Sequence, residues 1–385
     1  MGHDAGAAIV KDGEVLMDLQ EERINGIKHS DDLPLQAMSL CLKAAGLKHV
    51  SDCDEVVCAS VQPRRAVQTV LGYSVPGMGI KGWIKKQVSS LIFEQRVGLP
   101  SYFGNQWELL DSQRVYVEHH LAHAASAYYT QTEKQHKVLI FTMDGAGDGK
   151  STCIWKGESG KIVALQTRGL EAAIGYAYSA VTESLGYIHG DGEGTVMGLA
   201  PYGNASNAAG VFDYLFPEFD GVKLIKPTRF KPASYLSQGG SIQFHLEESK
   251  DLAKLLNTYS KEDLAAELQR KLEAVVLDLV KSWVKKTGIK HLAFAGGVFL
   301  NVKLNQRIWE WCAQNGLYQW IYPNPGDAGL ALGAALYRHH QSINPRWVAY
   351  NHLFHGPHYL DEEIVELLKL RKIPFEIVDN PALIS

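Results

Sequence analysis

The chain has 385 residues, 46% of them hydrophobic, and 38 Lys and Arg against 42 Asp and Glu give it a net charge of −4. This length and composition allow a large core and predict more than one domain, and the charge argues against a nucleic-acid-binding protein that works through general basicity. The sequence has no apolar run approaching the roughly 20 residues that span a bilayer and no secretory signal at its start. Its five cysteines are scattered without a CxxC pair, which is typical of the reducing cytoplasm. We therefore expect a cytoplasmic protein that binds neither membranes nor nucleic acids.

The first predicted element is a β-hairpin. Residues 7–10 are apolar, KDG is a turn, and residues 14–20 return as a second strand. A similar pattern recurs from residues 138–144, where VLIFTMD is followed by the glycine-rich GAGDG, a strand, the turn ESGK and another strand. Residues 3–10 align by eye with residues 147–154, which predicts two copies of one module in a duplicated α/β domain. The alternative is two unrelated hairpins, because short hairpins resemble one another.

The second half continues with strands and helices in alternation. Ser260 and Asp263 resemble a capping box at the start of a long helix, whose apolar residues recur at helical spacing until Gly288. The buried strand HLAFAGG leads into a helix that starts near Asn301, and WIYPNPGDAGLALGAALY predicts a strand, a Pro/Gly turn and a helix. This alternation predicts a parallel or mixed sheet covered on both faces. From about residue 346 a connector leads to a weak helix, DEEIVELLKLRK, and to the start of a strand at PFEIV.

The stretch VEHHLAHAA contains three histidines in a predicted helix. His119 and His123 are four residues apart and share one face, as ligands of one metal ion must, whereas His120 points about 100° away and is expected to be a hydrogen-bonding neighbour. Two imidazoles alone bind a divalent ion weakly, so carboxylates are needed. Asp144 and Asp327 follow buried strands, where open α/β sheets place their ligands. Two alternatives stay open: the histidine pair is incidental, or either aspartate, above all Asp327, is a helix N-cap.

Three glycine-rich stretches are candidate phosphate sites. AGGVFLN runs from a buried strand into a helix, so its backbone N–H groups can face a phosphate at a helix N-terminus, and nearby asparagines can hold a ribose. DGAGDG (144–149) and GDGEGTVMGLAPYG (190–203) are two further glycine-rich segments that can line the same phosphate site. The candidate nucleotide-binding residues are Gly145, Gly147, Glu193, Gly194, Gly198, Gly296, Gly297, Val298, Asn301 and Asn305.

The pattern of these glycines does not support two common nucleotide-binding folds. Neither a Walker A motif nor a Rossmann GxGxxG after a first strand is present. Three glycine stretches and two hairpin modules instead fit the duplicated actin/hexokinase-like (ribonuclease-H-like) ATPase fold, an α/β architecture in which two halves flank a nucleotide cleft.

A further set of polar residues lies near the start of the chain. His3 is followed by Asp4, and a histidine oriented by a neighbouring carboxylate is a candidate general base for a hydroxyl nucleophile. EERINGIKHS (21–30) supplies more charged residues, and the alternative is that it forms a solvated turn with a few ion pairs. GIKGWIKKQV (79–88) is basic and is expected to be a solvated helix face, with an acceptor-binding lid as the alternative.

Seven of these stretches together match a known family. They are GHDAGAA, EERINGIKH, VEHHLAHAASAY, MDGAGDG, GEGTVMGLAPYG, AGGVFLN and PNPGDAGLALGAAL. With these in order over nearly residues 1–340, the chain resembles the O-carbamoyltransferases grouped with nodulation protein U and the cephalosporin and aminoglycoside carbamoyltransferases. More distantly, it looks like the nucleotide-binding core of the enzymes that make threonylcarbamoyladenosine on tRNA, and like part of the hydrogenase-maturation carbamoyltransferase.

The resemblance implies a two-step carbamoyl transfer. A C-terminal domain makes carbamoyladenylate from carbamoyl phosphate and ATP, and the actin-like N-terminal domain moves the carbamoyl group to a hydroxyl of a small-molecule acceptor, such as a sugar or an antibiotic scaffold. One metal ion binds the adenylate. Iron is the expected metal, and zinc or another divalent ion is the alternative. Mg²⁺ can accompany the ATP. His3 falls on the position of the acceptor base, the glycine stretches fall on the nucleotide loops, and a homodimer is compatible with the family. The implied metal ligands are His119, His123, Asp144 and Asp327.

The sequence departs from the family pattern in three places. Thr195 stands where the family has a lysine. Only two residues precede the HD motif, where the family has an apolar strand. The segment that handles carbamoyl phosphate follows after about residue 385 in the family and is absent from this sequence. We therefore expect this chain to bind ATP or AMP without making carbamoyladenylate. Two other functions stay open: an ATP-dependent sugar kinase, with Mg²⁺ held by oxygen ligands, and a nucleotide-gated interaction module.

These patterns predict the following domains. Residues 1–345 form the transfer domain, with halves at about 1–135 and 136–345, and residues 346–385 form a connector and the start of the activating domain.

Overall fold

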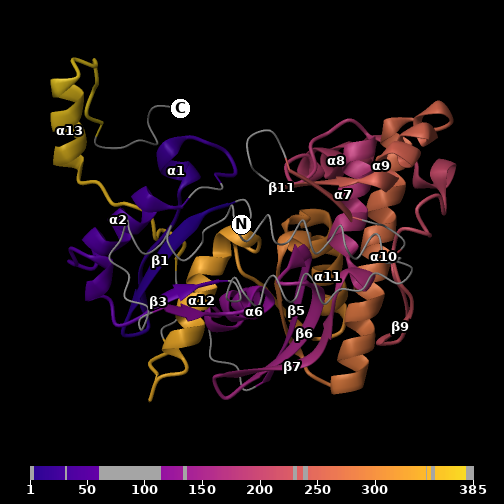
Figure 1. Cartoon of the computed structure of the whole chain (residues 1–385), viewed down its shortest axis with the longest axis horizontal. Helices are drawn as coiled ribbons and strands as arrows, with labels where there is room; N and C mark the ends of the chain where they lie inside the picture. Colours follow the sequence, from indigo (N-terminus) through magenta and orange to yellow (C-terminus); the bar gives the residue numbers. More distant parts are fainter. Residues whose placement is uncertain are drawn as a thin grey trace.

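The computed structural model describes residues 4–30, 33–59, 114–132, 137–228, 232–236, 242–343, 345–347 and 352–378 (Figure 1). His3 and the basic segment 79–88 lie outside these residues. Among the helices in this part of the chain, none combines the length and the apolar character that crossing a bilayer requires.

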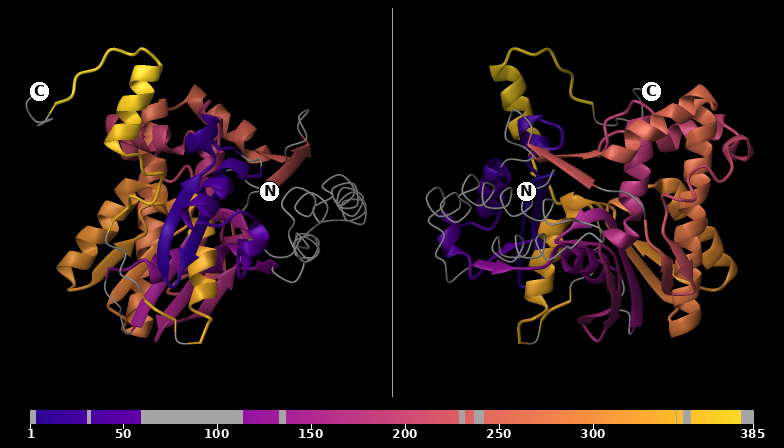
Figure 2. Two further views of the ribbon diagram at one scale, coloured as in Figure 1. Left: turned by 90° about the vertical axis from the view of Figure 1, so that its left-hand side faces the viewer. Right: turned by 45° about the vertical axis from the view of Figure 1, so that its right-hand side comes forward.

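A five-stranded mixed sheet forms the centre of the second half, as the sequence predicts (Figures 1 and 2). Its order is β13-β12-β5-β6-β7; β12 is parallel to both β13 and β5, whereas β6 is antiparallel to β5 and β7. The strands are Lys137–Gly147 (β5), Lys150–Glu158 (β6), Lys161–Arg168 (β7), His291–Ala295 (β12) and Tyr318–Ile321 (β13).

Both faces of this sheet are covered, because successive side chains of β5 enter different cores. Leu139 and Phe141 pack with the helices α7, α10 and α11, while Val138 and Ile140 pack with α6 and α12 on the other face. All four side chains are fully buried. The helices are His119–Tyr129 (α6), Ile174–Ser184 (α7), Lys261–Thr287 (α10), Val302–Gln314 (α11) and Leu330–His339 (α12).

Tight two-residue turns connect the hairpins where the sequence predicts them. Asp148 and Gly149 join β5 to β6 with φ of 48° and 79°, and Ser159 and Gly160 join β6 to β7 with φ of 52° and 77°. Positive φ at both central residues is the signature of type I′ turns, which match the twist of paired strands. The glycine turn predicted over 144–149 is therefore shorter than expected, because β5 continues to Gly147.

The first half contains the predicted N-terminal hairpin and a parallel pair. Met17 and Leu19 of the hairpin pack against the helix α2. Val10 packs against the core that contains α12. The elements are Gly6–Lys11 (β1), Glu14–Gln20 (β2), Glu22–Asn25 (α1), Leu35–Ala44 (α2), Val56–Cys58 (β3) and Arg114–Tyr116 (β4), with β3 parallel to β4. The α/β class is thus confirmed. The duplicated actin-like arrangement and the boundaries of the two halves stay predictions.

The long helix α10 begins and ends as predicted, but its cap is built differently. The Ser260 hydroxyl accepts from the Asp263 N–H at 3.1 Å, and Gly288 closes the helix in the left-handed region at φ 67°. The Asp263 carboxylate does not complete a capping box: it accepts from the Asn204 N–H at 2.8 Å and from Asn207 Nδ2 at 2.9 Å. This aspartate therefore ties the segment after α8 (Glu193–Leu199) to α10.

The remaining elements surround this core. The C-terminal helix α13 (Asp361–Leu370) stands apart from the body in Figure 1, and none of its residues is buried. The strand predicted at PFEIV does not form, since residues 373–378 are irregular and no described strand pairs with them. The other elements are Val50–Asp52 (η1), Leu170–Ala172 (η3), Glu193–Leu199 (α8), Ala200–Tyr202 (η4), Ala205–Ala208 (η5), Glu218–Asp220 (β8), Lys223–Lys226 (β9), Pro232–Leu236 (β10), Ile242–Leu246 (β11), Glu247–Leu252 (α9), Ala253–Asn257 (η6), Gly297–Leu300 (η7), Asp327–Gly329 (η8) and Asp361–Leu370 (α13).

Candidate metal centre

The helix that carries the histidines is fixed at its first turn by carboxylates. Glu118 is the N-cap, and its side chain accepts from the backbone N–H groups of His120 and Leu121 at 3.1 and 3.0 Å. Asp148, from the turn after β5, accepts from the His119 N–H at 2.8 Å. These bonds satisfy N–H groups that a helix start leaves open, and they attach α6 to the edge of the sheet where β5 ends.

Asp144 leaves the regular strand at a break in register. β5 and β6 pair regularly up to Met143 and resume at Gly147, so the residues between them are bulged. Such a bulge re-aims a side chain, and the Gly145 N–H donates back to Asp144 Oδ1 at 2.7 Å, which leaves Oδ2 for other partners. The bulge thus turns the carboxylate toward α6.

Asp327 reaches the same place from the loop that follows the edge strand β13. It follows β13 and opens η8, directly before α12. The Gly296 N–H at the end of β12 donates to the Pro325 carbonyl at 2.6 Å, which holds this loop against the sheet. Gly333 lets α12 lie directly on α6, because a Cβ there would come within 2.1 Å of the Ala122 carbonyl oxygen.

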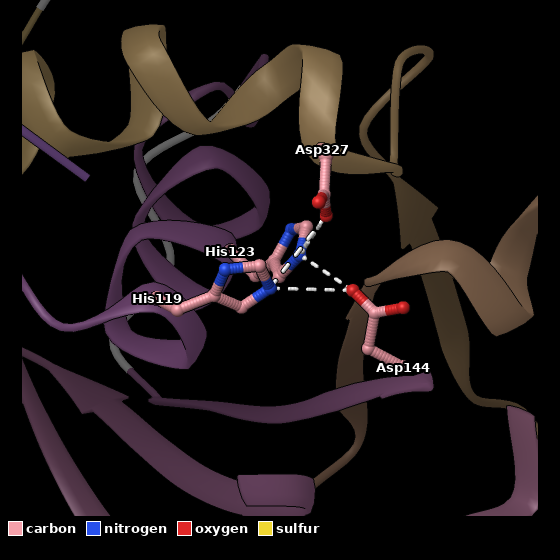
Figure 3. A group of neighbouring side chains, drawn as sticks. All are labelled: His119, His123, Asp144 and Asp327. Carbon is pink, nitrogen blue, oxygen red and sulfur yellow. Dashed lines mark hydrogen bonds and ion pairs between the residues drawn. The ribbon is translucent and has the colours of Figure 1, made fainter. Parts of the chain in front are cut away.

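The four predicted ligands converge (Figure 3). Asp144 Oδ2 lies 3.3 Å from His119 Nε2 and 3.2 Å from His123 Nε2, and Asp327 Oδ1 lies 3.6 and 3.4 Å from the same two nitrogens. Ligands that each lie about 2.1 Å from one ion are separated by roughly 3.0 to 3.4 Å in octahedral or tetrahedral geometry. The spacing in this structure therefore fits one metal ion, and neither aspartate is an N-cap with a side-chain bond to a helix.

In this cluster, the carboxylates and the imidazoles offset the effect of burial on each other's pKa. Burial by itself lowers the pKa of His119, but the carboxylates of Asp327 and Asp144 outweigh it and raise this pKa to about 9. Burial is likewise outweighed at His123, whose pKa is raised by hydrogen bonds to the same carboxylates. Burial raises the pKa of Asp144, yet the two imidazoles bring it well below its usual value. The two carboxylates thus favour positive charge at the point where the four side chains meet, which is the charge a bound cation would supply.

His120 is a hydrogen-bonding neighbour, as predicted. Its Nδ1 lies 3.0 Å from Thr142 Oγ1, which also accepts from Trp155 Nε1 at 3.0 Å. Burial and the two nearby histidines hold the pKa of His120 well below its usual value. This neutral ring therefore supports the packing between α6 and β5 and adds no charge to the cluster.

The glycines near the cluster make room for its side chains. A Cβ at Gly147 would lie 2.0 Å from His119 Cδ2, and a Cβ at Gly297 would lie 2.9 Å from Asp144 Oδ1. The prediction that the Gly296 N–H faces a phosphate is wrong, because Pro325 accepts from that group.

The asparagines of AGGVFLN also have structural partners. Asn301 was predicted to hold a ribose, but its amide is buried, caps α11 at the Leu304 N–H (2.9 Å) and pairs in both directions with Gln269 at 2.8 and 2.9 Å. That prediction is therefore wrong. Asn305 Nδ2 donates to the Phe299 carbonyl at 2.8 Å. A nucleotide contact at Asn305, Gly297 or Val298 stays a prediction.

The third glycine stretch forms the short helix α8. Glu193 Oε1 accepts from Ser179 Oγ at 2.5 Å and from the Gly190 N–H at 2.8 Å, so this carboxylate fixes the loop before α8 against α7. Gly194 and Gly198, one turn apart, are exposed and have no heavy atom within 4 Å of an added Cβ. The exposed face of α8 is thus open, as the predicted nucleotide contact requires.

Tyr176 is a residue near the cluster that sequence reasoning missed. Its ring covers Gly145, where a Cβ would meet Tyr176 Cε1 at 3.0 Å, and the adjacent Gly175 packs equally closely on the backbone of Asp144. Burial, followed by the charges of Asp144 and Asp327, raises the pKa of Tyr176, so its hydroxyl stays protonated. No motif links α7 to β5 in the sequence, so only the tertiary contact reveals this hydroxyl.

The charged residues near the start of the chain are structured, and EERINGIKHS is more than a solvated turn. Glu21 is 4% exposed and accepts from the N–H groups of Ala37 and Gln36 at 2.8 and 3.2 Å, at the start of α2. Glu22 accepts from the His29 N–H at 2.8 Å.

The predicted base His3 lies outside the described residues. Its neighbour Asp4 is described, and Asp4 Oδ1 lies 2.7 Å from His29 Nδ1. Asp4 therefore orients the ring of His29.

The two histidines and two carboxylates of this α/β fold form a candidate metal site, and comparison with known proteins shows the family of the chain. The family model described as "Carbamoyltransferase N-terminus" matches residues 1–336. The chain therefore belongs to the carbamoyltransferase family.

Curated relatives agree with this assignment. The chain is 32% identical to "Nodulation protein NolNO" of Sinorhizobium fredii over 87% of this chain and 46% of the relative, and 30% identical to the uncharacterized protein sll1178 of Synechocystis over 95% of this chain and 61% of the relative. It thus spans about half the length of the curated relatives it matches. The crystal structure of T. kodakarensis HypF is similar over 87% of this chain and 46% of HypF, with 14% identity and a TM-score of 0.41.

Proposed function

We propose that this domain transfers a carbamoyl group from carbamoyladenylate to a hydroxyl of a small-molecule acceptor, using one metal ion held by His119, His123, Asp144 and Asp327. The observation that carries the proposal is the convergence of these side chains from α6, β5 and η8 at spacings of 3.2 to 3.6 Å. Membership in the carbamoyltransferase family supports the reaction class. ATP and carbamoyl phosphate are the proposed sources of the adenylate.

The donor set favours a transition metal. Half of the ligands are imidazoles, which suit iron or zinc, whereas an ATP-dependent sugar kinase would hold Mg²⁺ with oxygen ligands. We therefore propose iron, with zinc or another divalent ion as the alternative. When bound, the ion supplies positive charge that stabilises the phosphate of the departing AMP.

The protein's own groups have separate tasks in this proposal. The protonated hydroxyl of Tyr176, beside Asp144 and Asp327, is a hydrogen-bond donor toward the bound adenylate. The open face of α8 at Gly194 and Gly198 lets a nucleotide approach the backbone. A base near the N-terminal segment must take the proton of the acceptor hydroxyl, and the resemblance implies His3 for this role.

The test is a transfer assay with freshly prepared carbamoyladenylate and a panel of sugars and aminoglycosides, read by mass spectrometry. Wild type should carbamoylate at least one acceptor and contain about one metal ion per chain. His123→Ala and Asp327→Ala should lose both, because each removes a ligand. His358→Gln, a change of an exposed histidine in the connector, should keep both. Metal-free wild type with unimpaired transfer would overturn the proposal, as would full metal occupancy in both ligand variants.

A further inference from the structure

A cavity of about 280 Å³ lies outside the metal centre, where three segments that are far apart in the sequence meet. Its walls come from the end of β2 with α1, from the loop that follows β13, and from the connector before α13. The Asp18 N–H of β2 donates to the His355 carbonyl at 2.9 Å, so the connector closes one side of the cavity. Sites for drug-sized molecules occupy roughly 300 to 1,000 Å³, so this cavity suits a smaller molecule.

The wall that β2 contributes to this cavity is polar. Met17 and Leu19 of β2 pack against α2. Successive side chains of a strand point to opposite faces, so Asp18 and Gln20 point away from α2, and both line the cavity. Asn324, after β13, lines the same space. A molecule in this cavity therefore meets one carboxyl group and two amides that form hydrogen bonds.

The carboxyl group of Asp18 lacks a cationic partner among the described residues. The Tyr322 hydroxyl donates to Asp18 Oδ2 at 2.8 Å. Arg23, which also lines the cavity, pairs with the neighbouring Glu22 at 3.6 Å. Burial outweighs the hydrogen bond from Tyr322 and raises the pKa of Asp18 to about 6. At neutral pH the cavity thus holds a carboxylate whose charge no described residue neutralises, and a buried charge is costly unless it is paired.

The titratable groups that surround Asp18 do not supply this charge. Burial lowers the pKa of His355 on the connector, so its ring is neutral at pH 7. Burial raises the pKa of Cys41 on α2 to about 12, so its thiol keeps its proton. Among the described residues that line the cavity, Asp18 is the acidic one. Its carboxylate therefore selects for a positively charged ligand.

The ligands for a metal ion are too few at this place. Protein sites for Zn²⁺ or Ca²⁺ use several side-chain ligands, and Asp18 belongs to neither group of potential ligands that the described residues form. His355, on the same wall, has its Nε2 3.0 Å from the His352 carbonyl oxygen. An ammonium group, by contrast, needs one carboxylate and neutral acceptors for its other protons. The amide oxygens of Gln20 and Asn324 are such acceptors.

The cavity adjoins the loop that carries one of the metal ligands. A Cβ at Gly329 would lie 2.4 Å from the Asn324 carbonyl oxygen and 2.7 Å from Tyr322 Cε1, so the wall of the cavity packs directly on η8. Asp327 is the first residue of η8. A molecule bound in the cavity is therefore next to a structural element of the metal centre, although it contacts none of the four ligands.

We propose that this cavity binds a small molecule with a protonated primary amine, whose ammonium group pairs with Asp18 and whose hydroxyl groups bind Gln20 and Asn324. The ammonium group supplies the positive charge that the described residues do not provide, and it forms a charge-assisted hydrogen bond with the carboxylate. The proposal concerns binding and does not depend on the proposed carbamoyl transfer.

The test compares the binding of glucosamine and glucose to the 385-residue protein by isothermal titration calorimetry, at pH 7 in phosphate buffer without amines. The two sugars have the same ring and differ at one position, where glucosamine carries an ammonium group instead of a hydroxyl. Wild type should bind glucosamine about tenfold or more tightly than glucose, because only the ammonium group pairs with Asp18. Asp18→Asn should bind both sugars equally. This variant should remain folded, since it removes a buried charge.

A carboxylate on the same strand provides the matched control. Glu14 is exposed, belongs to β2 and does not line the cavity, so Glu14→Gln should keep the preference for glucosamine. In wild type the preference should rise roughly tenfold from pH 5 to pH 7, because the carboxyl group of Asp18 ionises near pH 6. Equal affinities of wild type for the two sugars would overturn the proposal. A preference that persists in Asp18→Asn, or that is lost in Glu14→Gln, would also overturn it.

Discussion

Replacing Gly147 by alanine is a sharp test of the metal centre because it changes no ligand. Gly147 lies in β5, and its missing side chain leaves space for the ring of His119. The added methyl group would sit 2.0 Å from His119 Cδ2 and 2.4 Å from His119 Nε2. Nonbonded carbon atoms prefer about 3.5 to 4.0 Å. The ring must therefore move by roughly 1.5 Å, or β5 must shift by a similar amount.

The size of this shift determines the expected loss. Metal–ligand distances tolerate changes of only about 0.2 Å, so His119 ceases to be a ligand. Loss of a partner that merely orients a ligand already weakens metal binding about 10- to 100-fold, and the Gly147→Ala variant should lose at least 100-fold, or about 2.7 kcal/mol. Titration of the metal-free protein with Zn²⁺ or Fe²⁺, followed by elemental analysis, measures this effect.

A matched glycine provides the control. Gly194→Ala adds a methyl group with no heavy atom within 4 Å, so metal affinity should equal that of wild type. Circular dichroism of both variants checks that the fold persists. If Gly147→Ala binds the metal with wild-type affinity and stoichiometry, His119 is not a ligand in the arrangement described here, and the reasoning fails.

Three further predictions concern single side chains. Burial outweighs the hydrogen bond from Tyr322 and raises the pKa of Asp18 from 3.8 to about 6. The stability that this group contributes is fully present below pH 3.8 and is lost as pH rises through 6, by up to roughly 3 kcal/mol. Asp18→Asn should therefore raise the melting temperature at pH 8 but not at pH 3.5, and equal shifts at both would contradict this. Ser260→Ala removes the cap of α10 and should lower the free energy of unfolding by about 1 kcal/mol in urea titrations; no change would show the cap to be dispensable. Tyr176→Phe keeps the ring on Gly145 and should slow transfer about tenfold with unchanged metal content, whereas loss of metal would assign the hydroxyl to the ion.

Local patterns in the sequence determined much of this protein. The turns Asp148–Gly149 and Ser159–Gly160 follow from residues that tolerate positive φ. The start and end of α10 follow from Ser260 and Gly288. The shared face of His119 and His123 follows from helical periodicity. Each of these depends on residues within one or two turns of one another, so spacing alone predicts it.

The tertiary structure decided which distant residues meet. The sequence suggested Asp144 and Asp327 as ligands, but only the β13-β12-β5 order and the close packing of α12 on α6 bring them to one point. The same packing explains two failures. Gly296 and Asn301 carry the right groups for a nucleotide, yet Pro325 and Gln269 already take these groups.

The pair of His29 and Asp4 has the same origin. Sequence proximity suggested that Asp4 orients its neighbour His3, whereas the fold of the loop after α1 places His29 against this carboxylate at 2.7 Å. Its second contact, to Asp191, joins segments that no periodicity relates. Sequence patterns report contacts along one element, but the position of a metal site depends on how elements pack, and packing is set by the whole core.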